Sequence, residues 1–473
     1  MTALETTSII GVIGAGTMGA GIAQVAAAAG HPVILYDAFD GAAATGKARL
    51  AEGLEKLVAR GRMSATDKAA LLDRIEIADS LDAFSGAALV IEAVVERLDV
   101  KRELFAGLEA VIAADAILAT NTSSISVTSI ARDARHPERV VGMHFFNPAP
   151  IMKLVEVVSG VATSAEVART ILDTAQSWGK VPVPAKSTPG FIVNRVARPY
   201  YAEALRLCEE QLADPATLDA LMTEGAGFRM GPFDLMDLIG HDVNYAVSQS
   251  VFDAFYQDPR FRPSIAQLEL VNAGRLGRKS GHGFYDHASG ATRPEPSTEA
   301  VPGAAPFDLQ PGIGTRVDGV DVVLTDGRRA NDLARLSGAP VIVYDLGAAT
   351  GATRRLAFAA SREVPEAVLA RFVATLDAQG IAATRLRDWP GLVAMRTVAM
   401  LANEGFEAVL QGVADEAGVD AAMRYGVNYP EGPMAWARRI GLARIVSVLD
   451  ALHGLTGDPR YRASMGLRLA LDD

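Results

Sequence analysis

Short apolar runs and helical stretches alternate along roughly the first 185 residues of the chain. The apolar runs occupy residues 9–13, 33–36, 88–93, 117–120, 140–145, 154–158 and 181–183. Helical stretches separate them, such as 18–29, 100–114 and 165–178. Strands buried on both faces appear as continuous apolar runs, and their alternation with helices is typical of a doubly wound, mostly parallel sheet. We therefore predict an α/β domain over residues 1–187.

A membrane span is the alternative interpretation of the N-terminal segment, because residues 6–36 contain no Asp, Glu, Lys or Arg and are numerous enough to cross a bilayer. Six glycines and Pro32 interrupt this segment, however, and divide it into strand, loop, helix, turn and strand. The start of the chain is not basic, which disfavours a signal peptide. We expect a soluble, cytoplasmic protein without a membrane partner.

The pattern changes after Pro189. Long helical stretches with few strand signals continue to the GFYDH segment at residues 283–287, and five prolines follow before residue 314. Such a proline-rich composition is typical of a linker. We assign residues 188–287 to an all-helical domain and residues 288–314 to a linker.

The helical domain is repeated near the C-terminus. PGFIVNR at residues 189–195 recurs as PGLVAMR at residues 390–396, an offset of 201. The same offset relates Glu203 to Glu404, Asp214 to Asp415, Asp219 to Asp420, Met222 to Met423 and Gly225 to Gly426. A register kept over so many positions indicates a duplication. We assign residues 389–473 to the second copy and residues 315–388 to a small α/β segment, with a strand at 341–345 and a helix and strand within 364–388.

A glycine-rich turn follows the first predicted strand. The pattern GxGxxG falls on Gly14, Gly16 and Gly19, between an apolar strand and a helix. In a Rossmann-type domain the first glycine makes the tight turn, the second lets the backbone approach a pyrophosphate, and the third brings helix and strand close together. The phosphates then rest on the helix N-terminus. This context predicts a dinucleotide site.

The choice of dinucleotide depends on Asp37. This residue ends the second predicted strand, 18 residues after Gly19. A carboxylate there can bind both ribose hydroxyls, and it repels a 2′-phosphate. The expected cofactor is NAD.

His144 and Glu156 are the candidates for acid–base chemistry. His144 lies near the end of one predicted strand and Glu156 lies in the next. Hydride leaves an alcohol carbon only if a base takes the hydroxyl proton, and histidine is suited to this near neutral pH. Glu156 would then orient the ring, as in catalytic dyads. Spacing alone favours a structural histidine with satisfied hydrogen bonds over a catalytic one.

Composition narrows the class of partner. The formal net charge of -11 argues against a nucleic-acid-binding protein. The single cysteine, Cys208, cannot form an internal disulfide, in keeping with a reducing compartment, and its expected role is that of a small apolar filler.

The chain resembles the 3-hydroxyacyl-CoA dehydrogenase family, in its longer bacterial form with a duplicated C-terminal domain. The motifs that carry the resemblance occur in the family's order across residues 8–287 and are GAGTMGAGIAQ, EAVVERLDVKRELF, NTSSISVTSIA, MHFFNPAPIMKLVEVV, STPGFIVNR, GFRMGPFDLMDLIG and GRKSGHGFYDH. The resemblance implies reversible, NAD-dependent oxidation of an acyl-CoA substrate in fatty-acid or phenylacetate-type degradation. It implies His144 as the base and Glu156 as its partner.

The resemblance also implies roles for further residues. Ser123 and Asn194 would bind the substrate's oxygen, and Glu96, Lys101, Ser123 and Asn147 would lie at the cofactor. Ser123 follows a strand end, where it can equally cap a helix. Around residues 51–62 Gly53 stands at the family's serine position, and Arg60 is either a CoA phosphate contact or a solvated surface charge.

The second copy departs from the first. Met395 stands at the position of Asn194, and neither GxGxxG nor HFFNP recurs in residues 341–364. A second active centre is therefore not expected, and the copy is expected to cover the helical domain in pseudo-two-fold fashion. The chain would be a monomer or a homodimer. Two alternatives are a dehydrogenase of small hydroxy acids without CoA and a nucleotide-binding protein without catalysis.

Overall fold

The computed structural model describes residues 3–300, 303–309, 314–348 and 351–472 of the chain. Two compact units can be distinguished. The first consists of Met1–Val193 with Gly412–Val427, and the second consists of Asn194–Gln411 with Asn428–Asp473.

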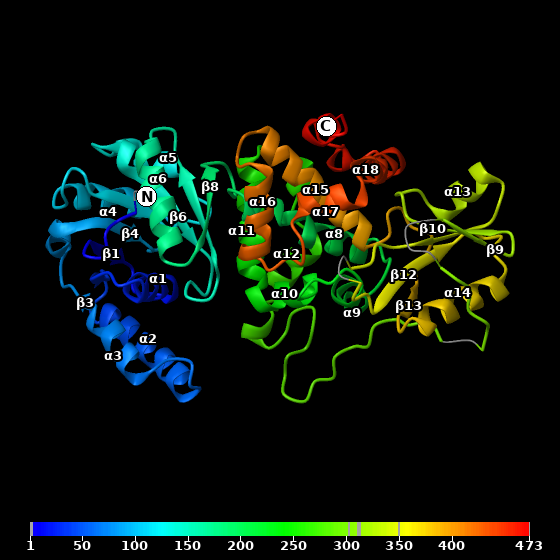
Figure 1. Cartoon of the computed structure of the whole chain (residues 1–473), viewed down its shortest axis with the longest axis horizontal. Coiled ribbons are helices and arrows are strands. Elements are labelled where there is room, and N and C mark those ends of the chain that lie inside the picture. The colour runs from blue at the N-terminus through cyan, green and yellow to red at the C-terminus, as the bar shows by residue number, and fades with distance from the viewer. Residues whose placement is uncertain (1–2, 301–302, 310–313, 349–350, 473) are drawn as a thin grey trace. The chain divides into compact units, whose positions relative to one another are not determined.

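An eight-stranded sheet with the order β3-β2-β1-β4-β5-β6-β7-β8 forms the centre of the first unit (Figure 1). Its strands are β1 (Ile9–Ile13), β2 (Val33–Tyr36), β3 (Ile75–Ile77), β4 (Ala87–Glu92), β5 (Ile117–Thr120), β6 (Val140–Phe145), β7 (Leu154–Ser159) and β8 (Val181–Lys186). Neighbouring strands are parallel except β6 and β7. The strand order reverses between β1 and β4, and open α/β sheets bind ligands at such a point.

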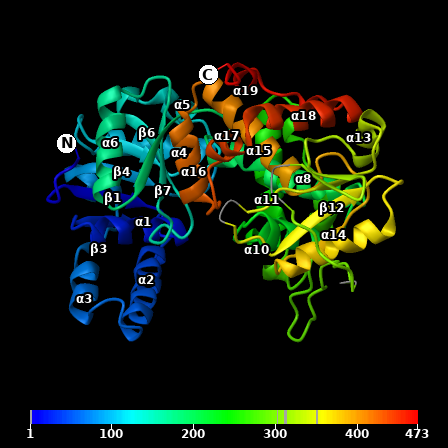
Figure 2. The same cartoon turned by 45° about the vertical axis from the view of Figure 1, so that its right-hand side comes forward.

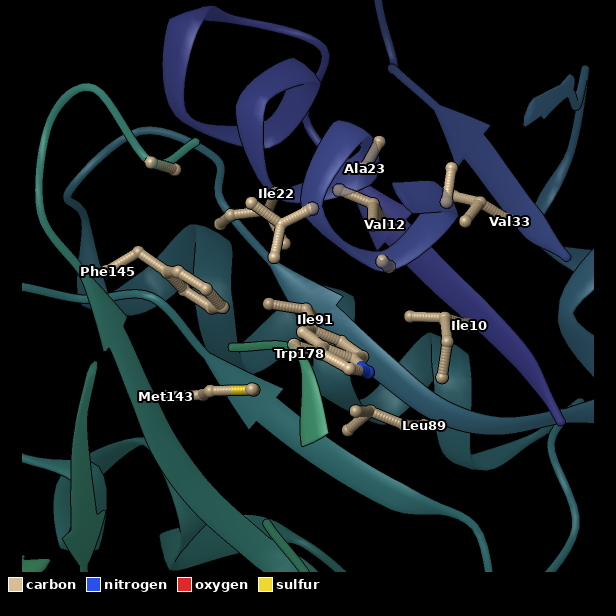
Figure 3. Packing of buried hydrophobic residues seen from close by; sticks show 14 of the residues in the cluster. Ile10, Val12, Ile22, Ala23, Val33, Leu89, Ile91, Met143, Phe145 and Trp178 are labelled. Atoms are coloured by element: carbon tan, nitrogen blue, oxygen red, sulfur yellow. The ribbon is translucent and has the colours of Figure 1, made fainter. Parts of the chain in front are cut away.

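Helices cover this sheet and bury its apolar side chains. They are α1 (Thr17–Ala28), α2 (Ala42–Ala59), α3 (Ala65–Asp73), α4 (Leu98–Glu109), α5 (Val127–Ile130) and α6 (Ala165–Ser177). Figure 3 shows Ile22 and Ala23 of α1 directed at the sheet residues Val12 and Ile91 in the core. The Rossmann-type fold expected from the sequence is confirmed.

The strand predictions are mostly correct, with two differences. β3 was not predicted, because only Ile75 of its three residues is buried and the apolar signal is correspondingly short. β8 continues three residues beyond the predicted end at 183, through Pro184 to Lys186. Prolines are tolerated here because β8 is the edge strand of the sheet.

Helix α16 (Glu416–Gly426) belongs to the first unit, although its sequence lies in the second helical copy. It packs against β7 and β8 (Figure 2). The Lys186 amide donates to the Val413 carbonyl over 2.9 Å, and a Cβ at Gly418 would lie 3.1 Å from Val183. The repeat therefore supplies part of the covering of the N-terminal sheet, which the sequence pattern does not predict.

The second unit contains most of both helical copies. Its helices are α7 (Val193–Val196, which begins at the unit boundary), α8 (Arg198–Glu209), α9 (Pro215–Ala220), α10 (Pro232–Ile239), α11 (His241–Ala254), α12 (Ile265–Asn272), α13 (Ala330–Ser337), α14 (Glu366–Ala378), α15 (Ala394–Leu410), α17 (Pro433–Ile440), α18 (Leu442–Thr456) and α19 (Met465–Leu469). Helix α8 of the first copy packs against α15 of the second.

Buried ion pairs link the two copies reciprocally. Arg195 donates to Glu404 over 2.5 Å, and Arg396 donates to Glu203 over 2.7 Å. The offset of 201 relates Arg195 to Arg396 and Glu203 to Glu404, so each copy supplies the same two residues. All four side chains are at most 3% exposed. This exchange is the pattern of a pseudo-two-fold interface, here within one unit.

A five-stranded sheet with the order β13-β12-β11-β10-β9 also belongs to the second unit. Its strands are β9 (Thr315–Val317), β10 (Val320–Leu324), β11 (Val341–Tyr344), β12 (Arg355–Ala360) and β13 (Ala382–Arg385). The sequence predicted fewer strands in this segment. The described part of the linker docks along this sheet, since the Glu299 amide donates to the Ala383 carbonyl over 2.8 Å.

Within the described ranges, no helix combines the length and the apolar character required to cross a membrane.

We expect a chain truncated after His287 to associate or aggregate, because it loses both the partner of α8 and the α16 covering of β7 and β8. Light scattering of the truncated and full-length proteins at equal concentration measures this.

A truncated chain that remains monomeric with full activity would show that the second copy is dispensable. Arg335→Met in the full-length chain serves as a control, because this side chain is 72% exposed and its loss should leave the scattering unchanged.

Candidate active site

The glycine turn between β1 and α1 has the geometry that a dinucleotide requires. Gly14 has a φ of 96°, and a Cβ there would lie 2.5 Å from the Ala93 carbonyl oxygen. A Cβ at Gly19 would lie 1.7 Å from the Gly14 oxygen, so helix and turn meet at this position. Gly16 is the N-cap of α1 and has open space around it. The turn therefore leaves room for a pyrophosphate at the helix N-terminus.

Asp37 follows β2 and lies beside this turn. Its Oδ2 accepts a hydrogen bond from the Ala15 amide over 2.7 Å, and its Oδ1 accepts from the Phe39 amide over 3.0 Å. The carboxylate is half-buried. These bonds fix an acidic group at the strand end where a dinucleotide places its ribose.

Lys101 of α4 lies between two glutamates at the carboxyl end of β4. Its ammonium is 2.6 Å from Glu92 and 3.2 Å from Glu96, and the side chain is 1% exposed. Glu92 also accepts from the Thr120 hydroxyl over 2.7 Å. A buried ammonium with two carboxylate partners is compensated, so Lys101 has a structural function here in addition to any contact with a cofactor.

Glu96 receives several hydrogen bonds from the loop after β5. Its Oε1 accepts from the Thr122 hydroxyl over 2.6 Å and from the amides of Ser123 and Ser124 over 2.9 and 3.1 Å. Burial opposes ionisation, but the Lys101 ammonium and these bonds together hold the pKa of Glu96 below its usual value. The cap of α5 is Ser126, so Ser123 does not have the capping role that its sequence context allows.

His144 and Glu156 form a buried pair across the antiparallel strands β6 and β7. They are directly opposite in the ladder, and His144 Nδ1 is 2.6 Å from Glu156 Oε2. The side chains are 6% and 0% exposed. The rings of Phe146 and Phe191 lie 4.5 and 5.8 Å from the imidazole, measured between centroids. No other hydrogen bond of the His144 ring occurs among the described residues, so Nε2 is the available nitrogen.

The second oxygen of Glu156 fixes the entry to the helical segment. Oε1 accepts from the Ile192 and Val193 amides over 3.1 and 2.9 Å. Asn194, the predicted substrate contact, is the next residue in the chain and lies in α7. The carboxylate thus has donors on both oxygens and cannot rotate freely.

The remaining residues that the sequence singles out, Arg60, Gly53 and Asn147, do not take part in the contacts described above. Arg60 caps the C-terminus of α2 and is exposed, in the loop that joins α2 to α3. Figure 1 shows the hairpin that these two helices form. Gly53, on the same helix, has open space around it. Asn147 is exposed just after β6.

Two polar residues of this region were not singled out from the sequence. Glu92 is the last residue of β4, and Asn121 directly follows β5, where its Oδ1 accepts from the Phe145 amide over 2.8 Å. The signal that identifies them is a polar residue at the carboxyl end of an apolar strand.

The second sheet contains a counterpart of the His–Glu position with different chemistry. Strands β10 to β13 repeat the pairing of β5 to β8: parallel, antiparallel, parallel. The offset of 201 places Asp345 at the His144 position and Ala357 at the Glu156 position. The two residues are also neighbours across the strands, because the Asp345 amide donates to the Ala357 carbonyl.

The Asp345 carboxylate takes over one function of Glu156. It accepts from the amides of Val393, Ala394 and Met395 over 2.8–2.9 Å. Val393 and Ala394 are the repeats of Ile192 and Val193, the donors to Glu156. Burial raises the pKa of Asp345. The small α/β segment therefore also fixes the chain through a buried carboxylate, but this carboxylate is that of Asp345, which stands in place of the histidine.

A doubly wound sheet with a glycine turn, an acidic residue after β2 and a buried His–Glu pair is the arrangement of a dinucleotide-dependent dehydrogenase. The family described as 3-hydroxyacyl-CoA dehydrogenase matches with its NAD binding domain at residues 9–188 and its C-terminal domain at residues 190–287 and 391–472. A reduced Rossmann-fold domain of 3-hydroxybutyryl-CoA dehydrogenase matches residues 322–390.

Individual proteins agree with these matches. The chain is 47% identical over 469 residues to 3-hydroxyadipyl-CoA dehydrogenase of Escherichia coli K12, covering 97% of this chain and 96% of the relative. It is 44% identical over 283 residues to the mitochondrial hydroxyacyl-coenzyme A dehydrogenase of Sus scrofa, covering 58% and 90%. The crystal structure of 3-hydroxybutyryl-CoA dehydrogenase from Escherichia coli K12 matches with a TM-score of 0.94 and 46% identity, covering 99% and 98%.

The chain belongs to the 3-hydroxyacyl-CoA dehydrogenase family. It is an NAD-dependent oxidoreductase. The resemblance recognised in the sequence is confirmed.

We expect Asp37→Ala to reduce the preference for NAD over NADP by roughly tenfold, about 1.4 kcal/mol, mostly through KM. The reason is that the variant removes the negative charge that repels a 2′-phosphate, together with a hydrogen bond to the glycine turn. Steady-state kinetics with both cofactors measure the preference.

Asp40→Ala is the matched control, because Asp40 is exposed three residues further on. Equal use of NAD and NADP by the unaltered protein would contradict the assignment of Asp37.

Proposed function

We propose that His144 and Glu156 act as a catalytic dyad in the reversible oxidation of an (S)-3-hydroxyacyl-CoA to the 3-oxoacyl-CoA. The single observation that carries this proposal is the buried 2.6 Å contact between His144 Nδ1 and Glu156 Oε2. The contact leaves Nε2 of the imidazole as the base for the substrate hydroxyl. It distinguishes His144 from a histidine whose ring nitrogens are both occupied.

Glu156 orients the base and compensates its charge. Because the Glu156 carboxylate accepts a hydrogen bond from Nδ1, the ring proton resides on Nδ1 and Nε2 carries the lone pair. When Nε2 takes the hydroxyl proton, the imidazolium faces a carboxylate that the Ile192 and Val193 amides hold in place. The positive charge then forms beside an existing negative charge, without rearrangement of the site.

NAD supplies the hydride acceptor when it is bound. The turn at Gly14, Gly16 and Gly19 would hold its pyrophosphate and Asp37 its adenosine ribose, which fits the space and the fixed carboxylate of the structure. We propose that Glu96, Lys101, Ser123 and Asn147 lie near its nicotinamide end, because they follow the carboxyl ends of β4, β5 and β6.

The substrate's oxygen would be bound by Ser123 and Asn194. Ser123 is held by Glu96 through its amide, and Asn194 directly follows the amides that Glu156 fixes. Arg60 would contact a phosphate of CoA. The exposure and the positive charge of its guanidinium at the end of α2 support such a contact.

The proposal assigns a different function to each domain. Residues 1–187 bind NAD, residues 188–287 complete the substrate site, residues 288–314 link the two halves, and residues 315–388 with 389–473 form a scaffold without a catalytic site. The Asp345–Ala357 pair and Met395 support the last assignment, because backbone amides occupy the Asp345 carboxylate and the side chains of Ala357 and Met395 offer no hydrogen-bonding nitrogen or oxygen.

A function in fatty-acid or phenylacetate-type acyl-CoA breakdown, in the cytoplasm, extends this proposal. It is supported by the relatives, which are called 3-hydroxyadipyl-CoA and 3-hydroxybutyryl-CoA dehydrogenase. A panel of kcat/KM values over 3-hydroxybutyryl, long-chain 3-hydroxyacyl and 3-hydroxyadipyl thioesters of CoA tests the acyl preference. Comparing acetoacetyl-CoA with free acetoacetate tests whether CoA is required.

We expect His144→Gln to lower kcat by about 10²–10⁴-fold while NADH still binds, the usual range for a positioned base. The kcat of Glu156→Gln should also fall steeply, because a neutral amide does not compensate the positive charge of the imidazolium. NADH oxidation with acetoacetyl-CoA measures turnover, and NADH fluorescence measures binding.

His136→Gln is the matched control, because that histidine is exposed on the same unit and its ring contacts the nearby Glu138. Near-normal turnover in His144→Gln would refute the dyad. Loss of NADH binding in that variant would indicate misfolding, and Glu156→Gln with intact binding would then decide.

We further expect Asn194→Ala to impair acyl-CoA turnover and Met395→Ala to leave it nearly unchanged. These positions are repeats of each other, and only the first carries a polar side chain. Steady-state kinetics on both variants measure the effect. Comparable losses would mean that the second copy contributes to catalysis.

A further inference from the structure

A cavity of about 480 Å³ lies within the second unit, and none of the residues assigned to catalysis lines it. One face of α8 forms a wall, with Arg198, Tyr201 and Arg206 at helical spacing. Two short 3-10 turns, η5 (Pro259–Phe261) and η7 (Pro459–Tyr461), form another part of its lining. These turns are the DPR segments repeated in the two helical copies, so the cavity lies where the copies meet.

The lining of the cavity is rich in arginine. Five arginines face three carboxylates: Arg198, Arg206, Arg260, Arg262 and Arg460 against Glu209, Glu210 and Asp458. Two of the three carboxylates are paired with arginines, and the third, Glu209, is exposed to solvent. Glu209 accepts from Ser264 over 2.6 Å, Glu210 from Arg396 over 3.0 Å, and Asp458 lies 2.7 Å from Arg460.

Two of the other arginines are paired outside the lining. Arg206 donates to Glu203 over 2.5 Å, and Arg260 lies 3.0 Å from Asp258 and 3.2 Å from Glu404. Arg262 is exposed to solvent. The positive charge that remains without compensation inside the cavity is therefore that of Arg198.

Arg198 is 7% exposed and has no carboxylate partner among the described residues. Its one hydrogen bond to a side chain goes from Nη1 to the Ser248 hydroxyl over 3.2 Å, and its Nε has no partner. The guanidinium lies 4.9 Å from the Tyr201 ring centroid. Burial lowers the pKa of Arg198, as expected for a charge without a counter-ion. Burying a guanidinium in this way costs free energy of folding unless an anion binds to it.

Packing does not require a charge at this position. The offset of 201 relates Arg198 to Ala399, which is fully buried in the second copy. The arginines nearby that do serve the fold, Arg195 and Arg396, each have a glutamate of the other copy as partner. Arg198 is thus an added charge within a scaffold that tolerates an apolar side chain.

We propose that this cavity is a binding site for a small organic anion with carboxylate or phosphate oxygens, and that Arg198 binds the anionic group. A guanidinium presents a planar pair of donors that matches such oxygens. Ser248 and Gln267 add polar groups, and the rings of Tyr201, Phe261 and Tyr461 provide apolar wall for the rest of the ligand. The volume is in the range typical of small-molecule sites.

The test measures the thermal stability of the full-length protein with three probes: inorganic phosphate, adipate and AMP. Sodium chloride at matched ionic strength serves as the baseline. A ligand that binds only the folded chain stabilises it, and we expect a rise in Tm of roughly 1–3 °C at ten times the dissociation constant. A response that exceeds the baseline and depends on Arg198 supports the site, because AMP can also bind at the dinucleotide turn of the first unit. An Arg198-dependent response to AMP alone identifies a nucleotide, and one to adipate alone identifies a dicarboxylate.

Arg198→Met should abolish this rise, whereas Arg169→Met, an exposed arginine of the first unit, should retain it. Without added anion, Arg198→Met should be at least as stable as the unaltered protein, because it removes an uncompensated buried charge. If that variant does not fold, Arg198→Lys, which keeps the charge but not the planar donors, should show a weaker response. No response to any probe, or an equal response in Arg198→Met or Arg198→Lys, overturns the proposal.

Discussion

The carboxylate of Glu156 is the constraint on which the rest of the site depends. One oxygen contacts the His144 ring, and the other accepts two amides at the start of the helical segment. A single buried charge therefore joins β6, β7 and the chain that leads to Asn194. Its burial is tolerated because both oxygens have donors. The position of the proposed base and the direction in which the chain leaves the sheet are thus determined by the same group.

The second sheet shows that these two functions of Glu156 are separable. There the amides of Val393 and Ala394 still meet a buried carboxylate, but it belongs to Asp345 and reaches them from the neighbouring strand. A buried carboxylate is retained because the backbone amides need an acceptor, and leaving them without one would cost free energy of folding. The imidazole, which no backbone group needs, is absent. The repeated segment thus retains the carboxylate that the fold requires.

Most of the NAD-binding domain follows from the sequence, because buried strands and the glycine turn have strong local patterns. Strand β3 has no such pattern, as two of its three residues face solvent. The His–Glu pair was recognisable from motif and resemblance, but its ladder register and the amides of Ile192 and Val193 are tertiary facts. The packing of α16 on β8 was equally unpredictable, because helix periodicity reveals a buried face without revealing what covers it.

The assignment of α16 to the N-terminal unit has a consequence for how the chain is synthesised. The eight strands of that unit are complete once Lys186 has left the ribosome, but their last helix ends at Gly426. At roughly 5–20 residues per second, the interval lasts on the order of 10–50 s. During this time the α16 side of β7 and β8 stays uncovered, and chaperones or neighbouring nascent chains have access to it before the chain covers it with its own later-made helix.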